Sequence, residues 1–128
     1  MTKVLVTGGA GMLGREVVKQ LTATGSRARI MSRKRRPPDV LSATEWVQAD
    51  LETGQGVADA VSEIDVVVHA ASSPFRHTRQ IDVDGTRFLL EQARAAGVAH
   101  VIYISIVGID RIPYDYYRCI GYLGRSRK

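Results

Sequence analysis

The segment from Val4 to Gly14 constrains the fold more than any other, because a short β-type run leads through a glycine-rich turn directly into a helical pattern. Gly8 allows the tight bend that leaves the strand, Gly11 removes a side chain where a pyrophosphate would approach the backbone, and Gly14 allows close packing of the helix on the sheet. The start of the helix offers unpaired N–H groups and the positive end of its dipole to an anion. The spacing therefore favours a dinucleotide site over a turn that only joins two elements.

The rest of the chain alternates between strand and helix patterns. Strands are expected at 3–7, 27–32, 45–48, 65–69 and 100–105, and helices at 12–23, 54–62 and 81–96. The segments 33–44 and 70–78 are expected to be loops. Repeated strand–helix units with short connections predict right-handed crossovers and a parallel sheet. The sequence thus predicts the α/β class, as a doubly wound Rossmann sheet of five strands in the order 3-2-1-4-5.

Length and composition predict one domain, with residues 1–118 as its body and 119–128 as an irregular basic tail. No apolar run approaches the roughly 20 residues that cross a bilayer, and the glycines after Thr7 interrupt the first apolar run too early for a signal peptide. Cys119 is the only cysteine, so an intrachain disulfide is excluded. A cytoplasmic location is the simplest expectation.

The net charge of +5 and the pI near 9.7 raise the question of nucleic-acid binding. The cations are concentrated at two places, and without them the remainder of the chain is mildly acidic. They are Arg33, Lys34, Arg35 and Arg36, and then Arg118, Arg125, Arg127 and Lys128. Because no recognition motif accompanies these two basic patches, nucleic-acid binding ranks last among the functions considered.

Four short motifs together resemble the atypical or extended short-chain dehydrogenases, which include NmrA-like and epimerase-like NAD(P)-binding proteins. The motifs are Thr7-Gly-x-x-Gly-x-x-Gly14, Asp50-Leu51, His69-Ala70-Ala71 and Asp82-Val-Asp-Gly-Thr86. The resemblance covers roughly residues 1–118. It implies a Rossmann fold and dinucleotide binding, and it is much less specific for a reaction.

The resemblance also implies a set of cofactor-binding residues. The three glycines, with the backbone of Met12 and Leu13, would hold the pyrophosphate. Asp50 would bind the adenine amino group beside Leu51, and Ala70 and Ala71 would pass along the adenosine ribose. Asp50 is equally well explained as a helix N-cap, and a lone histidine such as His69 at the end of a buried strand is more often structural. Both residues, and Thr7 at the start of the motif, belong to the candidate set.

The end of the second strand decides which dinucleotide is expected. An NAD enzyme usually carries a carboxylate there for the ribose 2′-hydroxyl. Here Ser32 is followed by four cations, with no carboxylate before Asp39. Arginine can hold a 2′-phosphate with two parallel hydrogen bonds. We therefore expect NADP(H) rather than NAD, with Arg33 as the main contact and Ser32 as a helper; a solvated basic loop or a nucleic-acid or localisation patch is the alternative.

The catalytic pattern that the resemblance implies is incomplete. Reductases of this kind use a serine or threonine near the end of the fifth strand and a Tyr-x-x-x-Lys pair, whose lysine lowers the tyrosine pKa. Ser105 and Tyr116 are the candidates, but Ile120 stands where the lysine is expected. Tyr114 has Arg118 at that spacing, and arginine holds its proton too firmly to relay it.

Two functions follow from these patterns. The first is an NADP(H)-dependent oxidoreductase that transfers hydride to or from a small carbonyl, quinone or sugar-type substrate. The second is a non-catalytic NAD(P)-binding module, such as a redox sensor or an assembly factor. Glycines interrupt the helix expected near the C-terminus, which indicates a shortened product with an altered tail. The uncovered flank of the fifth strand indicates a surface for self-association.

Overall fold

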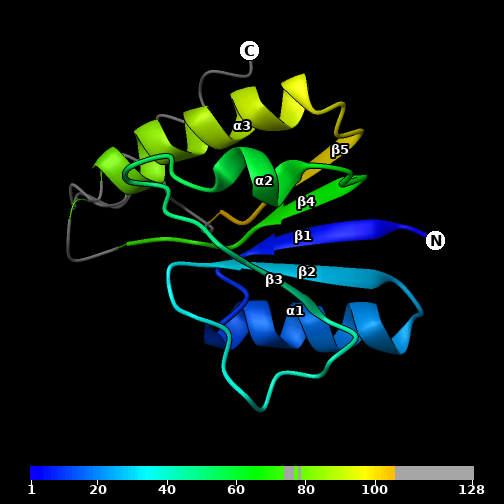
Figure 1. Ribbon diagram of the computed structural model, residues 1–128. Helices are drawn as coiled ribbons and strands as arrows, with labels where there is room; N and C mark the ends of the chain where they lie inside the picture. The colour runs from blue at the N-terminus through cyan, green and yellow to red at the C-terminus, as the bar shows by residue number, and fades with distance from the viewer. Residues whose placement is uncertain (74–76, 78, 106–128) are drawn as a thin grey trace.

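Five parallel strands form the central sheet of the computed structural model, which describes residues 1–73, 77 and 79–105 (Figure 1). The strands are β1 (Lys3–Thr7), β2 (Arg27–Ser32), β3 (Glu45–Gln48), β4 (Val66–His69) and β5 (His100–Tyr103). Their order is β3-β2-β1-β4-β5, and every neighbouring pair is parallel. The predicted fold class and strand order are confirmed.

Helices cover both faces of this sheet. Helix α1 (Met12–Ala23) lies on one face, while α2 (Val57–Val61) and α3 (Thr86–Ala95) lie on the other, as Figure 1 shows. The chain moves from β1 to β2 in one direction along the sheet and from β4 to β5 in the other. Right-handed crossovers in opposite directions place their helices on opposite faces.

The core has one apolar cluster on each face because strand side chains alternate between faces. The larger cluster lies under α2 and α3 and includes Leu5, Met31, Val61, Val67 and Leu89. The smaller cluster lies under α1 and joins Val4, Val6 and Val68 to Val17, Val18 and Leu21. Strand β4 is therefore buried on both sides, which explains its continuous valine sequence.

The expected element boundaries fail mainly in the helices. Helix α2 begins only at Val57, because Gly54 and Gly56 take positive φ angles of 80° and 77° and form turns instead. The helix expected at 81–96 begins as a π-helix, η1 (Arg79–Gly85), before α3 continues it. Its first turns do not keep the 3.6-residue period assumed from the sequence, since Ile81, Asp82 and Val83 are all buried. Strand β4 starts one residue later than expected, and β5 ends two residues earlier.

A buried arginine fixes α2 against the sheet. Arg29 in β2 is only 8% exposed, and its Nη1 donates to the carbonyls of Asp59, Ala60 and Ser62 at 3.3, 2.9 and 2.7 Å. The guanidinium also pairs with Glu45 of β3 at 2.7 Å. Burial alone would raise the pKa of Glu45, but hydrogen bonds and charges from Arg29 and Lys3 outweigh it and leave the pKa lowered. The carbonyls at the end of α2 thus have a charged partner.

The turn between β1 and α1 is packed backbone against backbone. Gly8 has a φ of +67°, and a Cβ there would lie 2.9 Å from the backbone of Ala71. A Cβ on Gly14 would lie 2.1 Å from the carbonyl oxygen of Gly8 and 2.7 Å from the Cα of Gly9. Gly14 therefore allows the helix to pack on the turn itself, not on the sheet as the sequence analysis expected.

We expect Gly14→Ala to lower the free energy of unfolding by about 2–3 kcal/mol, because the added methyl group must displace backbone and not a flexible side chain. Gly11→Ala is the matched control, since a Cβ there would meet only the Gly8 carbonyl oxygen, at 3.3 Å. Urea unfolding followed by circular dichroism measures both. Equal stabilities for the two variants would contradict this account of Gly14.

Candidate functional site

A cleft of about 560 Å³ opens at the carboxyl ends of β1, β2 and β4. Its walls come from the β1–α1 turn, the end of β2, the segment after β3 and the segment after β4. The lining residues are Gly8, Ala10–Gly14, Met31–Lys34, Ala49–Leu51, Ala70–Ser73 and Ile81. The cleft lies where the strand order reverses between β1 and β4, which is the usual ligand position in open α/β sheets.

The start of α1 forms one wall of this cleft and has no side-chain cap. Gly11 is the N-cap residue, and the first turn of α1 has no acidic side chain. The first N–H groups of a helix have no partner within the helix, so this end can receive an anion. Leu13 is 50% exposed and lines the cleft beside Met12.

Thr7 and His69 lie beside the cleft wall and do not line the cleft. The buried Thr7 Oγ1 accepts the N–H groups of Ala70 and Ala71 at 3.1 and 3.2 Å. The same oxygen lies 2.6 Å from His69 Nδ1. Thr7 therefore holds in place the two alanines that form the cleft wall after β4.

The hydrogen bonds of His69 define its neutral tautomer. Because Thr7 Oγ1 already accepts two N–H groups, its hydroxyl hydrogen is the one directed at Nδ1. Nε2 then carries the proton and donates to Thr86 Oγ1 at 2.8 Å. Burial lowers the pKa of His69 to about 4. His69 thus links β1, β4 and α3 as a neutral ring, and this geometry favours a structural role for it.

Asp50 and Leu51 follow β3 and line the cleft. Asp50 Oδ1 accepts the N–H of Glu52 at 2.8 Å, and the Asp50 carbonyl accepts the N–H of Gly54 at 2.8 Å. Asp50 therefore closes the local turn, whereas the N-cap of α2 is Gly56. The alternative interpretation of Asp50 as a helix N-cap is wrong, because the turn intervenes. Leu51 is buried, and its backbone lies against Gly85.

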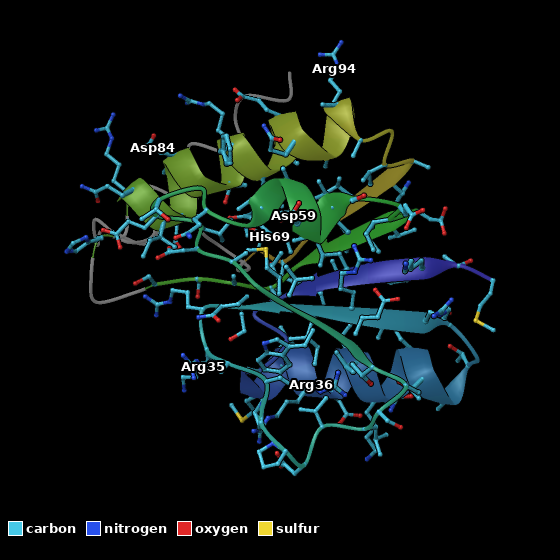
Figure 2. The ribbon with its side chains drawn as sticks, in the orientation of Figure 1. Arg35, Arg36, Asp59, His69, Asp84 and Arg94 are labelled. Carbon is cyan, nitrogen blue, oxygen red and sulfur yellow. The ribbon has the colours of Figure 1, made fainter. Side chains whose placement is uncertain are left out.

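The basic residues after β2 divide between the cleft and its surroundings. Ser32, Arg33 and Lys34 line the cleft. Arg35 and Arg36 do not, and Figure 2 shows Arg35 directed outward from the loop that follows β2. Ser32 Oγ accepts the N–H of Lys34 at 3.2 Å, so its hydroxyl hydrogen can still be donated to a ligand. The cleft therefore has its cationic wall at the end of β2.

Asp82 is a residue that the sequence analysis quoted within a motif without giving it a role. It is 3% exposed; its Oδ1 accepts the N–H of Ser73 at 2.9 Å, and its Oδ2 is buried with no hydrogen-bond partner among the residues that the structure describes. Burial raises its pKa, and the Ser73 N–H offsets this effect only in part. Asp82 thereby anchors Ser73, a cleft residue. An acidic residue within an apolar stretch, Ile81-Asp-Val83, was the available signal.

Of the two predicted catalytic residues, only Ser105 lies among the described residues, and it does not line this cleft. Ser105 is exposed, lies two residues beyond the end of β5 and is not among the cleft-lining residues. Tyr116 and the predicted tail at 119–128 lie outside the described residues. Within the described part of the chain, no group of three His, Cys, Asp or Glu side chains could hold a metal ion. No helix among these residues is long and apolar enough to cross a membrane.

The family model described as NAD(P)H-binding matches residues 8–119 of this chain. The chain belongs to this family, and its structural neighbours are short-chain dehydrogenase and epimerase-like Rossmann proteins. A nicotinamide dinucleotide is therefore the class of cofactor. The resemblance found in the sequence is confirmed.

Individual relatives match the chain over most of its length. It is 28% identical to 2-alkyl-3-oxoalkanoate reductase of Stenotrophomonas maltophilia, covering 88% of this chain and 39% of the relative. It is 29% identical to a photosystem II assembly factor of Trieres chinensis, covering 84% and 35%. A short-chain dehydrogenase/reductase superfamily protein from Agrobacterium tumefaciens, solved with NAD bound, matches with a TM-score of 0.79 and 28% identity, covering 97% and 43%. The chain spans less than half the length of each.

We expect Thr7→Val to lower the free energy of unfolding by about 2–3 kcal/mol, because the Ala71 N–H and His69 Nδ1 would lose their partner inside the protein. Thr7→Ser keeps the hydroxyl and is the matched control, with a smaller loss. Urea unfolding of the three proteins measures the difference. A Thr7→Val variant as stable as Thr7→Ser would show that the hydroxyl does not hold this edge of the cleft.

The buried imidazole also predicts a dependence of stability on pH. The pKa of His69 is about 4 in the folded protein and near 6.5 when unfolded. The unfolded chain therefore binds a proton first as the pH falls, so stability is full above about pH 6.5 and decreases toward pH 4. Between pH 8 and pH 5 we expect a loss of about 2 kcal/mol that His69→Asn lacks. Parallel pH profiles for the two proteins would contradict this assignment.

Proposed function

We propose that the cleft binds NADP(H) and that the protein is an oxidoreductase-like member of the atypical short-chain dehydrogenases. The substrate would be a small carbonyl, quinone or sugar-type compound. The observation that carries the proposal is the position of Arg33 and Lys34, which line the same cleft as the glycine turn. A 2′-phosphate at the end of β2 would meet two cations there, and a carboxylate that would repel it is absent from the end of β2.

Each part of the dinucleotide has a candidate partner on the cleft wall. The backbone of the turn and the start of α1, from Gly8 to Gly14, would hold the pyrophosphate. Asp50 would accept a hydrogen bond from the adenine amino group, and Ala70 and Ala71 would lie along the adenosine ribose. Ser32 and Arg33 would hold the 2′-phosphate. Thr7 and His69 would contribute indirectly, through the alanine wall that their hydrogen bonds support.

The reaction proposed is hydride transfer, which the bound nicotinamide would supply. In this proposal Ser105 orients the substrate oxygen, and Tyr116 exchanges a proton with that oxygen. Ile120 stands where the Tyr-x-x-x-Lys pattern has the lysine that lowers the pKa of the phenol. In the direction of alcohol oxidation, where the phenolate would accept the proton, turnover should therefore be slow at neutral pH and should rise with pH.

A second candidate function is a non-catalytic dinucleotide-binding module, such as a redox sensor or an assembly factor. Ile120 in place of the catalytic lysine favours this function, because a protein that only binds the cofactor does not need that lysine. One relative of the chain is named as a photosystem II assembly factor. A module would bind the cofactor without consuming it.

Two measurements on the purified protein separate these functions. Isothermal titration with NADPH and NADH tests cofactor binding, and NADPH oxidation across carbonyl and quinone panels tests turnover. Turnover that disappears in Tyr116→Phe, with unchanged NADPH affinity, supports the oxidoreductase. Tight binding without turnover supports the module. A folded protein that binds neither dinucleotide at millimolar concentration would refute both.

We expect Arg33→Asp to weaken NADPH binding at least tenfold while changing NADH binding about twofold or less, because it replaces attraction of the 2′-phosphate by repulsion. Arg35→Asp makes the same charge change two residues further along, at a side chain that does not line the cleft. It should alter both affinities little. Equal losses for NADPH and NADH in Arg33→Asp would show that Arg33 does not touch the 2′-phosphate.

A further inference from the structure

Two side chains of β3 hold the main chain that carries the cationic wall. Trp46 Nε1 donates to the carbonyl of Lys34 at 2.9 Å, and Gln48 Nε2 donates to the carbonyl of Arg33 at 2.9 Å. We propose that Trp46 and Gln48 are positioning residues that set the preference for the phosphorylated cofactor by aiming Arg33 and Lys34. This inference rests on the proposed NADP(H) binding and extends it to residues outside the cofactor contacts.

The register of the sheet places these two donors where they are needed. Trp46 pairs with Ile30 of β2, and Gln48 pairs with Ser32, the last residue of β2. Residues two apart in a strand face the same side of the sheet. Both side chains can therefore reach the chain that leaves β2, and each takes one of two consecutive carbonyls.

Together with Ser32, these bonds fix three consecutive points of the loop. Ser32 Oγ accepts the Lys34 N–H, and the carbonyls of Arg33 and Lys34 are held by β3. An exposed loop would otherwise sample many backbone conformations, and ordering it on binding would reduce affinity. Here three hydrogen bonds restrain the backbone of Arg33 and Lys34, so cofactor binding would mainly order the torsions of the two cationic side chains.

The position of Arg33 gives this restraint a consequence for specificity. Arg33 lines the main cleft and also a neighbouring polar hollow of about 460 Å³, which it shares with Gln48, Ala49 and Asp50. A guanidinium at this boundary can turn toward the cleft or into the hollow. The hydrogen bond from Gln48 to the Arg33 carbonyl fixes the position of the Arg33 backbone, from which the guanidinium extends. Trp46 lines neither space, so its effect on binding must be indirect.

The test compares Trp46→Phe and Gln48→Leu, each of which removes one donor. Phe keeps an aromatic ring, and Leu is close to Gln in size. Isothermal titration gives Kd values for NADPH, NADH, adenosine 2′,5′-bisphosphate and AMP. We expect NADPH and the bisphosphate to bind about five- to tenfold more weakly, with NADH and AMP changed less than about twofold. Gln55→Leu is the control, because Gln55 lines the same hollow and its side chain makes no described hydrogen bond to the basic loop.

The outcomes separate this inference from the proposed function. Equal weakening of phosphorylated and plain ligands would assign both side chains a purely structural role and overturn it. A wild-type protein that prefers NADPH, with variants that keep this preference, would overturn the inference alone. A wild-type protein that binds neither dinucleotide would refute the proposed function and the inference together. If circular dichroism shows that Trp46→Phe does not fold, the ratio of the NADPH affinity to the NADH affinity in Gln48→Leu decides the question.

Discussion

The close approach of three backbone segments at the end of β1 is the constraint on which the cleft depends. The Gly8 turn lies against Ala71 after β4, and the first turn of α1 lies against the Gly8 carbonyl. Neither contact leaves room for a Cβ, so glycine is a steric requirement at positions 8 and 14. Thr7 then joins the two strand ends through its hydroxyl. The uncapped start of α1, proposed to hold the pyrophosphate, is thus fixed against the sheet and not carried on a free loop.

The sequence predicted best what depends on local pattern. The bounds of β1, α1, β2 and β3 match because glycines, buried runs and amphipathic spacing mark them locally. The errors arise where tertiary contacts override periodicity. In η1, Asp82 is buried and accepts the Ser73 N–H, so the buried residues do not follow the 3.6-residue period of an α-helix. After β3, the side chain of Asp50 accepts the N–H of Glu52 within a turn, and the sequence pattern did not predict this turn.

The site itself was predictable only in part, for a related reason. Cleft residues that use backbone or charge, such as Gly11 and Arg33, follow from the motif and from composition. Trp46 and Gln48 act through side-chain bonds to another segment's carbonyls, and nothing in their local sequence signals this. Ala49 and Met31 line the cleft only because of strand register. Such contributions require the register of β3 against β2, which the predicted strand order does not specify.

Two arginines at and just after β2, Arg29 and Arg33, have different surroundings and therefore different expected roles. Arg29, in the strand that leads to the cationic wall, is buried and neutralised by Glu45 and by the carbonyls that end α2. Arg33, four residues later, faces the cleft without a described ion-pair partner. A paired, buried cation contributes to the fold and cannot attract a ligand, whereas an unpaired cation beside a helix N-terminus attracts anions. Strand β2 therefore supplies a structural arginine, and the loop that follows it supplies the arginine proposed for cofactor recognition.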